Sequence, residues 1–293
     1  MIVVSNTFIP GLEKQVPKKD RTPIATTDAG DRAYYVTGKP PRRMKDFDDS
    51  DEESEDDDMI MDDDTFGPPD EICQSLTRAF WKPNFTDRMT MFIAGAPGAG
   101  KSYLAKQMIN LLPENFDILL FTALEENDGN FDDIDKGRLV KIKMVPEVLS
   151  GITLTEIRKR TKGPQVILLF DDVDKIRDSK VQNLVFAIMN DALANGRGHE
   201  KHDGKGDIHV ICTSHSANDY QKTKYTFENS NYVALFPGTT PPLQMYRMFD
   251  KLGLDKELCK KMMRLGRRQE LRSIIIHKVV PMYMIFGNKI MLL

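Results

Sequence analysis

The chain of 293 residues has few cysteines, which form the disulfides of small secreted proteins, and lacks the long apolar runs that cross a membrane. Its three cysteines, Cys73, Cys212 and Cys259, are odd in number and far apart. They show neither a disulfide framework nor metal-ligand spacing, which favours reduced thiols in an intracellular protein. No run of 18 apolar residues occurs, so we expect no membrane span.

Charge is distributed unevenly. Residues 46–64 contain 13 acidic residues and no lysine or arginine, so a chain with a net charge of −3 carries +10 outside this acidic segment. A basic body with an acidic tail is one pattern of proteins that bind nucleic acid. The segment itself is typical of a solubilising tail. Two alternatives remain open: a polyanion that competes with DNA, and an address for a basic partner.

The composition divides the chain into two parts. Residues 1–67 are predicted to form a disordered tail, because Pro, Lys, Arg, Thr and Asp dominate there and apolar periodicity is absent. Residues 68–293 are predicted to form a single folded domain, and a hydrophobic content of 40% for the chain is enough for a sizeable core.

The clearest motif is G-A-P-G-A-G-K-S at residues 95–102, which fits the phosphate-cradling pattern G-x-x-x-x-G-K-[ST]. It lies between an apolar run of strand type at 89–94 and helical spacing at 103–112. Such a turn points backbone N–H groups and a helix dipole at an anion. The expected ATP-binding residues are Gly95, Ala96, Pro97, Gly98, Ala99, Gly100, Lys101, Ser102 and Tyr103. Lys101 would reach the phosphates, and the Ser102 hydroxyl would bind Mg²⁺.

A second motif supplies the acids that such a loop needs. Residues 166–170 are five consecutive apolar residues, and Asp171, Asp172 and Asp174 follow closely. This pattern predicts a strand that is buried on both faces and delivers carboxylates at its carboxyl end. We expect Asp171 to hold Mg²⁺ and Asp172 to orient or deprotonate the attacking water. The alternative is an acidic turn without a catalytic role.

The remaining pattern alternates strands and helices. Strands are predicted at 116–122, 139–144, 207–215, 231–238 and 273–279, with a hairpin over 282–293 around Gly287-Asn288. Helices are predicted at 154–162, 181–194, 243–252 and 256–265, and a short entry helix at 75–82. The fold class is therefore α/β, a three-layer P-loop NTPase with a mainly parallel central sheet. A basic cluster near the C-terminus comprises Arg264, Arg267, Arg268 and Arg272.

Taken together, these motifs resemble the viral genome-packaging ATPases of the HerA/FtsK superfamily, found in large DNA viruses and virophages. The matching segments are Gly95–Ser102, Leu168–Asp172, Gly196–His199, Val210–His215 and Asn231–Phe236. The resemblance implies ATP hydrolysis coupled to the movement of double-stranded DNA into a capsid. It further implies a homo-oligomeric ring, capsid proteins as partners, and a location in the virion or in the cytoplasm or nucleus of an infected cell.

One departure from the family concerns the sensor position. The family usually has a glutamine at the end of the fourth strand, where it senses the γ-phosphate and the attacking water, and this chain has His215 there. Because imidazole also donates or accepts a hydrogen bond, we expect His215 to take that role with some pH sensitivity. The expected catalytic residues are then Lys101, Asp172 and His215. Rings of this superfamily often use a neighbour's arginine finger, and the candidates are Arg138, Arg158, Arg160 and Arg197.

Two other functions remain open. The chain could be another P-loop enzyme, such as an AAA-type helicase or loader or a nucleotide kinase. It could also be a DNA-binding scaffold in which nucleotide only stabilises the assembly. The second acid, Asp172, argues against the scaffold, because a protein that only binds nucleotide does not need it.

Overall fold

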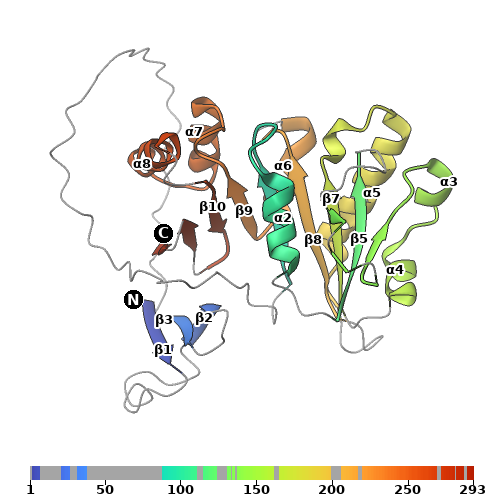
Figure 1. Ribbon diagram of the computed structural model, residues 1–293, viewed down its shortest axis with the longest axis horizontal. Coiled ribbons are helices and arrows are strands. Elements are labelled where there is room, and N and C mark those ends of the chain that lie inside the picture. Colours follow the sequence, from blue (N-terminus) through green and yellow to red (C-terminus); the bar gives the residue numbers. More distant parts are fainter. Residues whose placement is uncertain are drawn as a thin grey trace.

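The computed structural model describes most of the chain from residue 88 onward and three short segments before it (Figure 1). The described residues are 2–6, 21–26, 32–37, 88–110, 115–123, 131–132, 134–135, 137–161, 165–198, 206–216, 220–268, 272–280, 282–286 and 289–293. The acidic segment 46–64 and the entry helix predicted at 75–82 lie outside these residues.

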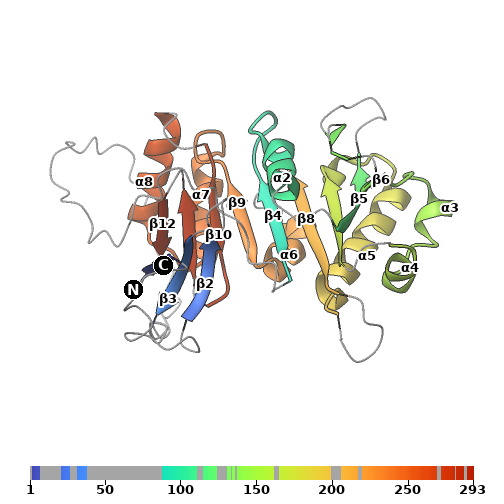
Figure 2. The same cartoon turned by 60° about the horizontal axis from the view of Figure 1, so that its bottom comes forward.

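A nine-stranded sheet runs through the domain (Figures 1 and 2). In order across the sheet, its strands are β12 (Lys289–Leu292), β11 (Tyr283–Phe286), β10 (Ile274–His277), β9 (Tyr232–Leu235), β4 (Thr90–Ala94), β8 (Ile208–Ser214), β7 (Gln165–Asp171), β5 (Phe116–Thr122) and β6 (Leu139–Lys141). The strands from β9 to β6 pair in parallel, whereas β10, β11 and β12 add antiparallel pairs. The predicted α/β class with a mainly parallel sheet is confirmed.

Strand β7 shows why the central strands read as unbroken apolar runs. Val166, Leu168 and Phe170 pack into the core on one face of the sheet, and Ile167 and Leu169 pack into the core on the other. Because successive side chains point to opposite faces, a strand covered on both sides needs an apolar residue at every position.

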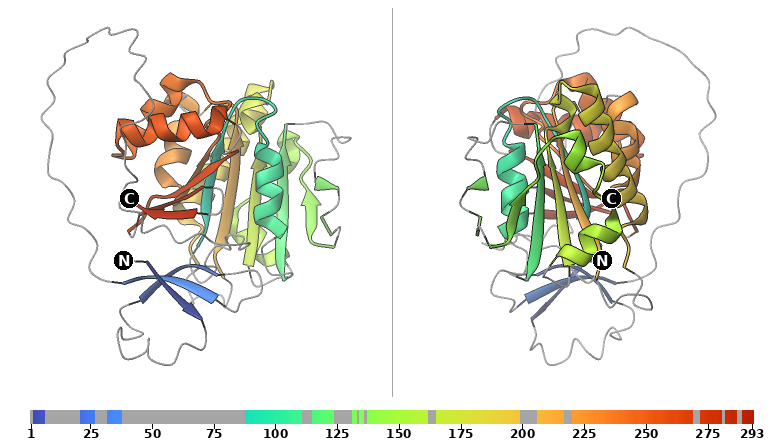
Figure 3. Two further views of the ribbon diagram at one scale, coloured as in Figure 1. Left: turned by 60° about the vertical axis from the view of Figure 1, so that its left-hand side comes forward. Right: turned by 90° about the vertical axis from the view of Figure 1, so that its right-hand side faces the viewer.

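Helices cover both faces and complete three layers (Figure 3). Helix α2 (Lys101–Asn110) packs on one face through Leu104 and Ala105. The opposite core takes residues from α3 (Pro146–Leu149), α4 (Leu154–Arg160), α5 (Ser179–Asn195), α6 (Tyr220–Asn229), α7 (Pro242–Lys251) and α8 (Lys256–Arg267). In the part of the chain that the structure describes, no helix is long and apolar enough to cross a membrane.

The ends of the helices follow local sequence signals. Asp178 caps α5 by accepting hydrogen bonds from the N–H groups of Lys180 and Val181, and Asp255 caps α8 in the same way through Glu257. Helix α6 is the main element that sequence periodicity misses. Its buried positions include Thr223 and Thr226, which a hydrophobic pattern does not mark.

Within the predicted N-terminal tail, the structure describes three short strands. Strands β1 (Ile2–Asn6), β2 (Arg21–Thr26) and β3 (Arg32–Thr37) form a separate antiparallel sheet in the order β1-β3-β2. Short runs rich in β-branched and aromatic residues, such as residues 2–4 and 34–36, favour strands even though the surrounding composition is polar. Edge strand β2 accommodates Pro23 at an irregularity in its register. The domain boundary near 67 lies outside the described residues and stays a prediction.

Candidate nucleotide and magnesium site

The glycine-rich loop connects β4 to α2, as the motif predicted. Gly98 and Gly100 have φ angles of 77° and 100°, a left-handed backbone that glycine adopts without strain. Helix α2 then begins at Lys101, and the N–H groups of its first turn have no acceptor within the helix. These donors and the helix dipole form an anion-binding site at the end of β4.

The loop is anchored by the neighbouring strands. The N–H of Gly95 donates to the carbonyl of Ser214 at 3.1 Å, which joins the start of the loop to the end of β8. On the other side, a Cβ atom at Gly95 would lie 2.6 Å from Cδ2 of Phe236. Glycine is therefore required at position 95, because the ring of Phe236 occupies the space that a side chain would need.

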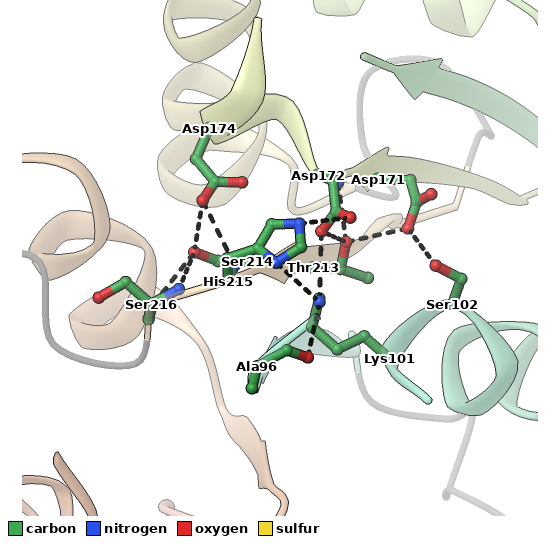
Figure 4. Close-up of polar contacts among 10 residues, drawn as sticks. All are labelled: Ala96, Lys101, Ser102, Asp171, Asp172, Asp174, Thr213, Ser214, His215 and Ser216. Carbon is green, nitrogen blue, oxygen red and sulfur yellow. Dashed lines mark hydrogen bonds and ion pairs between the residues drawn. The ribbon is translucent and has the colours of Figure 1, made fainter. Parts of the chain in front are cut away.

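The strand order determines which residues meet at this loop. β8 lies between the P-loop strand β4 and the acid-bearing strand β7, and all three run in parallel. Their carboxyl ends therefore share one edge of the sheet, with Thr213, Ser214 and His215 between the P-loop and the two acids. Figure 4 shows these residues converging from the three strands.

The carboxylates of Asp171 and Asp172 both contact the hydroxyl of Thr213. Asp172 has φ 48° and ψ 34°, which makes it the one non-glycine residue with positive φ among those described. Adjacent residues of a continued strand would point to opposite faces, but this turn brings both carboxylates to Thr213. The Thr213 hydroxyl lies 2.9 Å from Oδ1 of Asp171 and 3.1 Å from Oδ1 of Asp172, and it accepts the N–H of Asp172 at 2.8 Å.

The residues predicted to hold Mg²⁺ fit a cation. The Ser102 hydroxyl lies 3.1 Å from Oδ1 of Asp171, so a hydroxyl and a carboxylate face each other between α2 and β7. The other oxygen of Asp171, Oδ2, is buried without a hydrogen-bond partner among the described residues. Burial, and next the charge of Asp172, raise the pKa of Asp171 to about 6. A buried, unsatisfied carboxylate beside a hydroxyl is a hard-oxygen ligand set that suits Mg²⁺.

Lys101, His215 and Asp172 form a connected group (Figure 4). Lys101 is 5% exposed, and its Nζ lies 3.8 Å from Oδ1 of Asp172 and 3.4 Å from both the Ala96 carbonyl and Nδ1 of His215. Nε2 of His215 lies 2.9 Å from Oδ2 of Asp172. Because an ammonium group only donates, Nδ1 is the acceptor, and Nε2 carries the proton that faces the carboxylate.

Two residues that the sequence analysis gave no definite role support this group. The carboxylate of Asp174 accepts the Ser214 hydroxyl at 3.2 Å and the backbone N–H of His215 at 3.3 Å, which positions the end of β8. Thr213 is the hydroxyl that both acids share. The sequence signal for these residues is only that polar residues follow the ends of neighbouring strands, and it does not say which of them touch.

The arginine-finger candidates lie away from this edge or in surface pairs. Arg138 donates to the carbonyl of Phe116, the first residue of β5, and Arg158 donates to the carbonyl of Arg197. Arg197 itself lies close to the start of β8, where Ile208 donates to Gly196. Arg160 pairs with Glu156 on the surface of α4. The hydrogen bonds and ion pair given for Arg138, Arg158 and Arg160 are thus made with residues outside the nucleotide loop.

A glycine-rich loop before a helix, a buried lysine and a pair of acids on a parallel α/β sheet define a P-loop NTPase. Residues 91–228 match the family model described as ATPase family associated with various cellular activities (AAA). The chain is therefore an ATP-hydrolysing P-loop enzyme, as the sequence predicted.

Comparison with known proteins adds a viral relative. The chain is 27% identical over 212 residues to a Sputnik virophage protein named "Uncharacterized protein V3", covering 70% of this chain and 78% of that protein. Solved structures with similarity include the genome packaging NTPase B204 from Sulfolobus turreted icosahedral virus 2, at 14% identity, TM-score 0.40 and coverage of 68% and 96%. Another is the cytoplasmic domain of the Thermomonospora curvata type VII secretion ATPase EccC, at 12% identity, TM-score 0.36 and coverage of 76% and 23%.

Proposed function

We propose that this chain hydrolyses ATP to move double-stranded DNA into a viral capsid as part of a homo-oligomeric ring. The observation that carries the proposal is the contact of His215 with both Lys101 and Asp172. His215 ends one of the segments that resemble packaging ATPases, at the position where that family places its sensor residue. The virophage relative supports a viral setting, and the net charge of +10 outside the acidic segment favours a polyanionic partner.

Each residue of the site would have a separate role. The loop from Gly95 to Tyr103 and the first turn of α2 would hold the phosphates, with Lys101 neutralising their charge. Ser102 and Asp171 would hold Mg²⁺, which supplies charge stabilisation at the phosphates when it is bound. Asp172 would orient the attacking water. His215, at the end of β8, would sense whether the γ-phosphate is present, because it contacts both Lys101 and Asp172.

Another matching segment, Asn231–Phe236, has a structural reason to be present near this site. Asn231 accepts the N–H of Thr90 at 2.6 Å and donates to the carbonyl of Arg88 at 2.8 Å, so it ties β9 to the start of the P-loop strand. Phe236, at the end of the same segment, packs against Gly95. The segment Asn231–Phe236 therefore holds both ends of β4 in place.

The test is the ATPase rate of the full chain with and without duplex DNA, together with the mass of the particle in solution. The proposal expects duplex DNA to stimulate turnover and the mass to correspond to a multimer. Asp172→Asn is the matched control, because it removes turnover without removing the DNA-binding charge. Turnover that ignores DNA and transfers phosphate to a small acceptor would indicate a nucleotide kinase. Nucleotide-dependent assembly without turnover would indicate a scaffold.

A further inference from the structure

Arg272 lies against the nucleotide loop although it is far from that loop in the sequence. Its guanidinium carbon is 5.2 Å from the centre of the Tyr103 ring. A Cβ atom placed on Gly100 would lie 2.7 Å from one terminal nitrogen of Arg272, and 3.2 Å from both Cζ and Nε. The guanidinium group therefore lies against the backbone of Gly100 and over the ring of Tyr103.

The antiparallel strand β10 explains how Arg272 arrives there. Ile274, the first residue of β10, pairs with Leu235 of β9, and Leu235 pairs in turn with Ala94, the last residue of β4. Because β10 runs opposite to β4, its start lies at the edge where β4 ends. Arg272 precedes β10 by two residues and so reaches the glycine-rich loop from the side opposite β8.

The surroundings of Arg272 favour an anionic ligand. Arg272 and Tyr103 are both exposed, Tyr103 at 52%. Among the described residues, no carboxylate pairs with the Arg272 guanidinium group. Stacking on an aromatic ring fixes the plane of a guanidinium group and leaves its N–H edge available. That edge, beside the N–H groups of a phosphate-binding loop, presents the forked donors that match a phosphate group.

We propose that Arg272 binds the phosphate chain of the nucleotide held by its own loop, with Tyr103 as the platform that orients the guanidinium group. Arg272 would thus be a second cation of the site, contributed by the C-terminal strands of the same chain and distinct from a neighbour's finger. Glycine at position 100 is needed for this arrangement, because any side chain there would displace the guanidinium group. The inference rests on the nucleotide-binding part of the proposed function and not on DNA movement.

The experiment measures the dissociation constants of ADP and of a non-hydrolysable ATP analogue for the full chain without DNA. We expect Arg272→Ala to weaken both by about 10- to 100-fold, the range for charge-assisted hydrogen bonds. Arg272→Lys should recover only part of the loss, because an ammonium group lacks the planar fork. Tyr103→Leu should weaken binding less than Arg272→Ala, because the guanidinium group keeps its charge and loses only its aromatic platform.

Arg264→Ala is the matched control, since Arg264 is an exposed arginine on α8 in the same basic cluster. Arg264→Ala should bind nucleotide as the wild type does. If it lost as much nucleotide affinity as Arg272→Ala, the effect would come from the loss of any positive charge, and the proposal would be overturned. Affinities within about twofold of wild type in Arg272→Ala would also overturn it, as would a loss that appears only at protein concentrations where the chain assembles. Failure of DNA to stimulate turnover would leave the inference standing, because no DNA is present in this experiment.

Discussion

His215 lies between the two halves of the site, with Nε2 2.9 Å from Oδ2 of Asp172 and Nδ1 3.4 Å from Nζ of Lys101. The residue that differs from the family's usual glutamine thus touches both the lysine of the phosphate loop and the second acid of β7. Since β8 separates these two strands, a shift of its carboxyl end would move both contacts together. Five predictions follow from this arrangement and from the charges around it.

Replacing Lys101 tests the phosphate loop. Lys101→Ala should fold, because the surrounding core does not depend on its ammonium group, but ATP binding or turnover should fall by about 100-fold or more. Nucleotide binding and ATPase rate are the measurements, with a thermal melt to confirm folding. The control is Lys180→Ala, which removes an exposed lysine at the start of α5. A variant at Lys101 with wild-type turnover would refute the assignment of the loop.

The two acids should separate in function. Asp171→Asn should weaken Mg²⁺-dependent nucleotide binding, because it removes a negative charge from the proposed metal ligands. Asp172→Asn should retain binding and slow hydrolysis by about 100-fold or more, because it removes the group that orients water. Binding and single-turnover hydrolysis are measured for each variant. The reverse pattern, or a greater loss in Asp174→Asn, would show that the roles along this strand are assigned to the wrong residues.

Asp171 should also destabilise the protein when metal and nucleotide are absent. Its pKa is raised to about 6 from an ordinary value of 3.8, mainly by burial, so the folded state holds the proton more tightly than the unfolded state does. This contribution to stability is fully present below pH 3.8 and is lost as the pH rises through 6. We expect Asp171→Asn to raise the free energy of unfolding at pH 7 by roughly 2 to 3 kcal/mol.

Denaturant unfolding of the metal-free protein across pH checks this prediction. The advantage of Asp171→Asn should shrink as the pH falls from 6 towards 4, because wild-type Asp171 then becomes protonated. Asp178→Asn is a suitable comparison, since Asp178 is an exposed carboxylate that caps α5. A variant at Asp171 that is less stable than wild type at pH 7 would contradict the argument.

The side chain at position 215 should matter through its hydrogen bonds. His215→Gln keeps a group that can donate to Asp172 and should retain most of the turnover, whereas His215→Ala should lose it while still binding nucleotide. Nucleotide binding and single-turnover hydrolysis are measured for both variants. Wild-type turnover in His215→Ala would show that the hydrogen bonds of His215 play no part in hydrolysis.

The acidic segment 46–64 should compete with DNA. Its 13 acidic residues are tethered to a chain that is otherwise net basic, so their effective concentration near any basic surface is high. Deleting residues 46–64 should tighten non-specific binding of duplex DNA at low salt, and the gain should shrink as salt rises. DNA affinity of the full and deleted chains across a salt series is the measurement. Superimposable curves would leave the segment as a solubilising tail.

Local chemistry made much of this protein readable from its sequence. The glycine-rich loop is a contiguous motif whose backbone requirements appear directly in its residues, and β7 is recognisable because a strand buried on both faces must be apolar at each position. Strand β5 has the predicted limits, and the pairing of Phe286 with Lys289 leaves two residues between β11 and β12, as the predicted hairpin requires. These features depend on neighbours along the chain.

Other features depend on residues that are distant in the sequence and were decided by the tertiary structure. Nothing local states that β8 lies between β4 and β7, that Thr213 contacts both acids, or that Asp172 turns left-handed to allow it. Arg272 reaches Gly100 only because β10 is antiparallel to β9. Strand order and direction are set by which faces pack together over the whole core. The sequence pattern of one strand does not indicate which strands lie beside it.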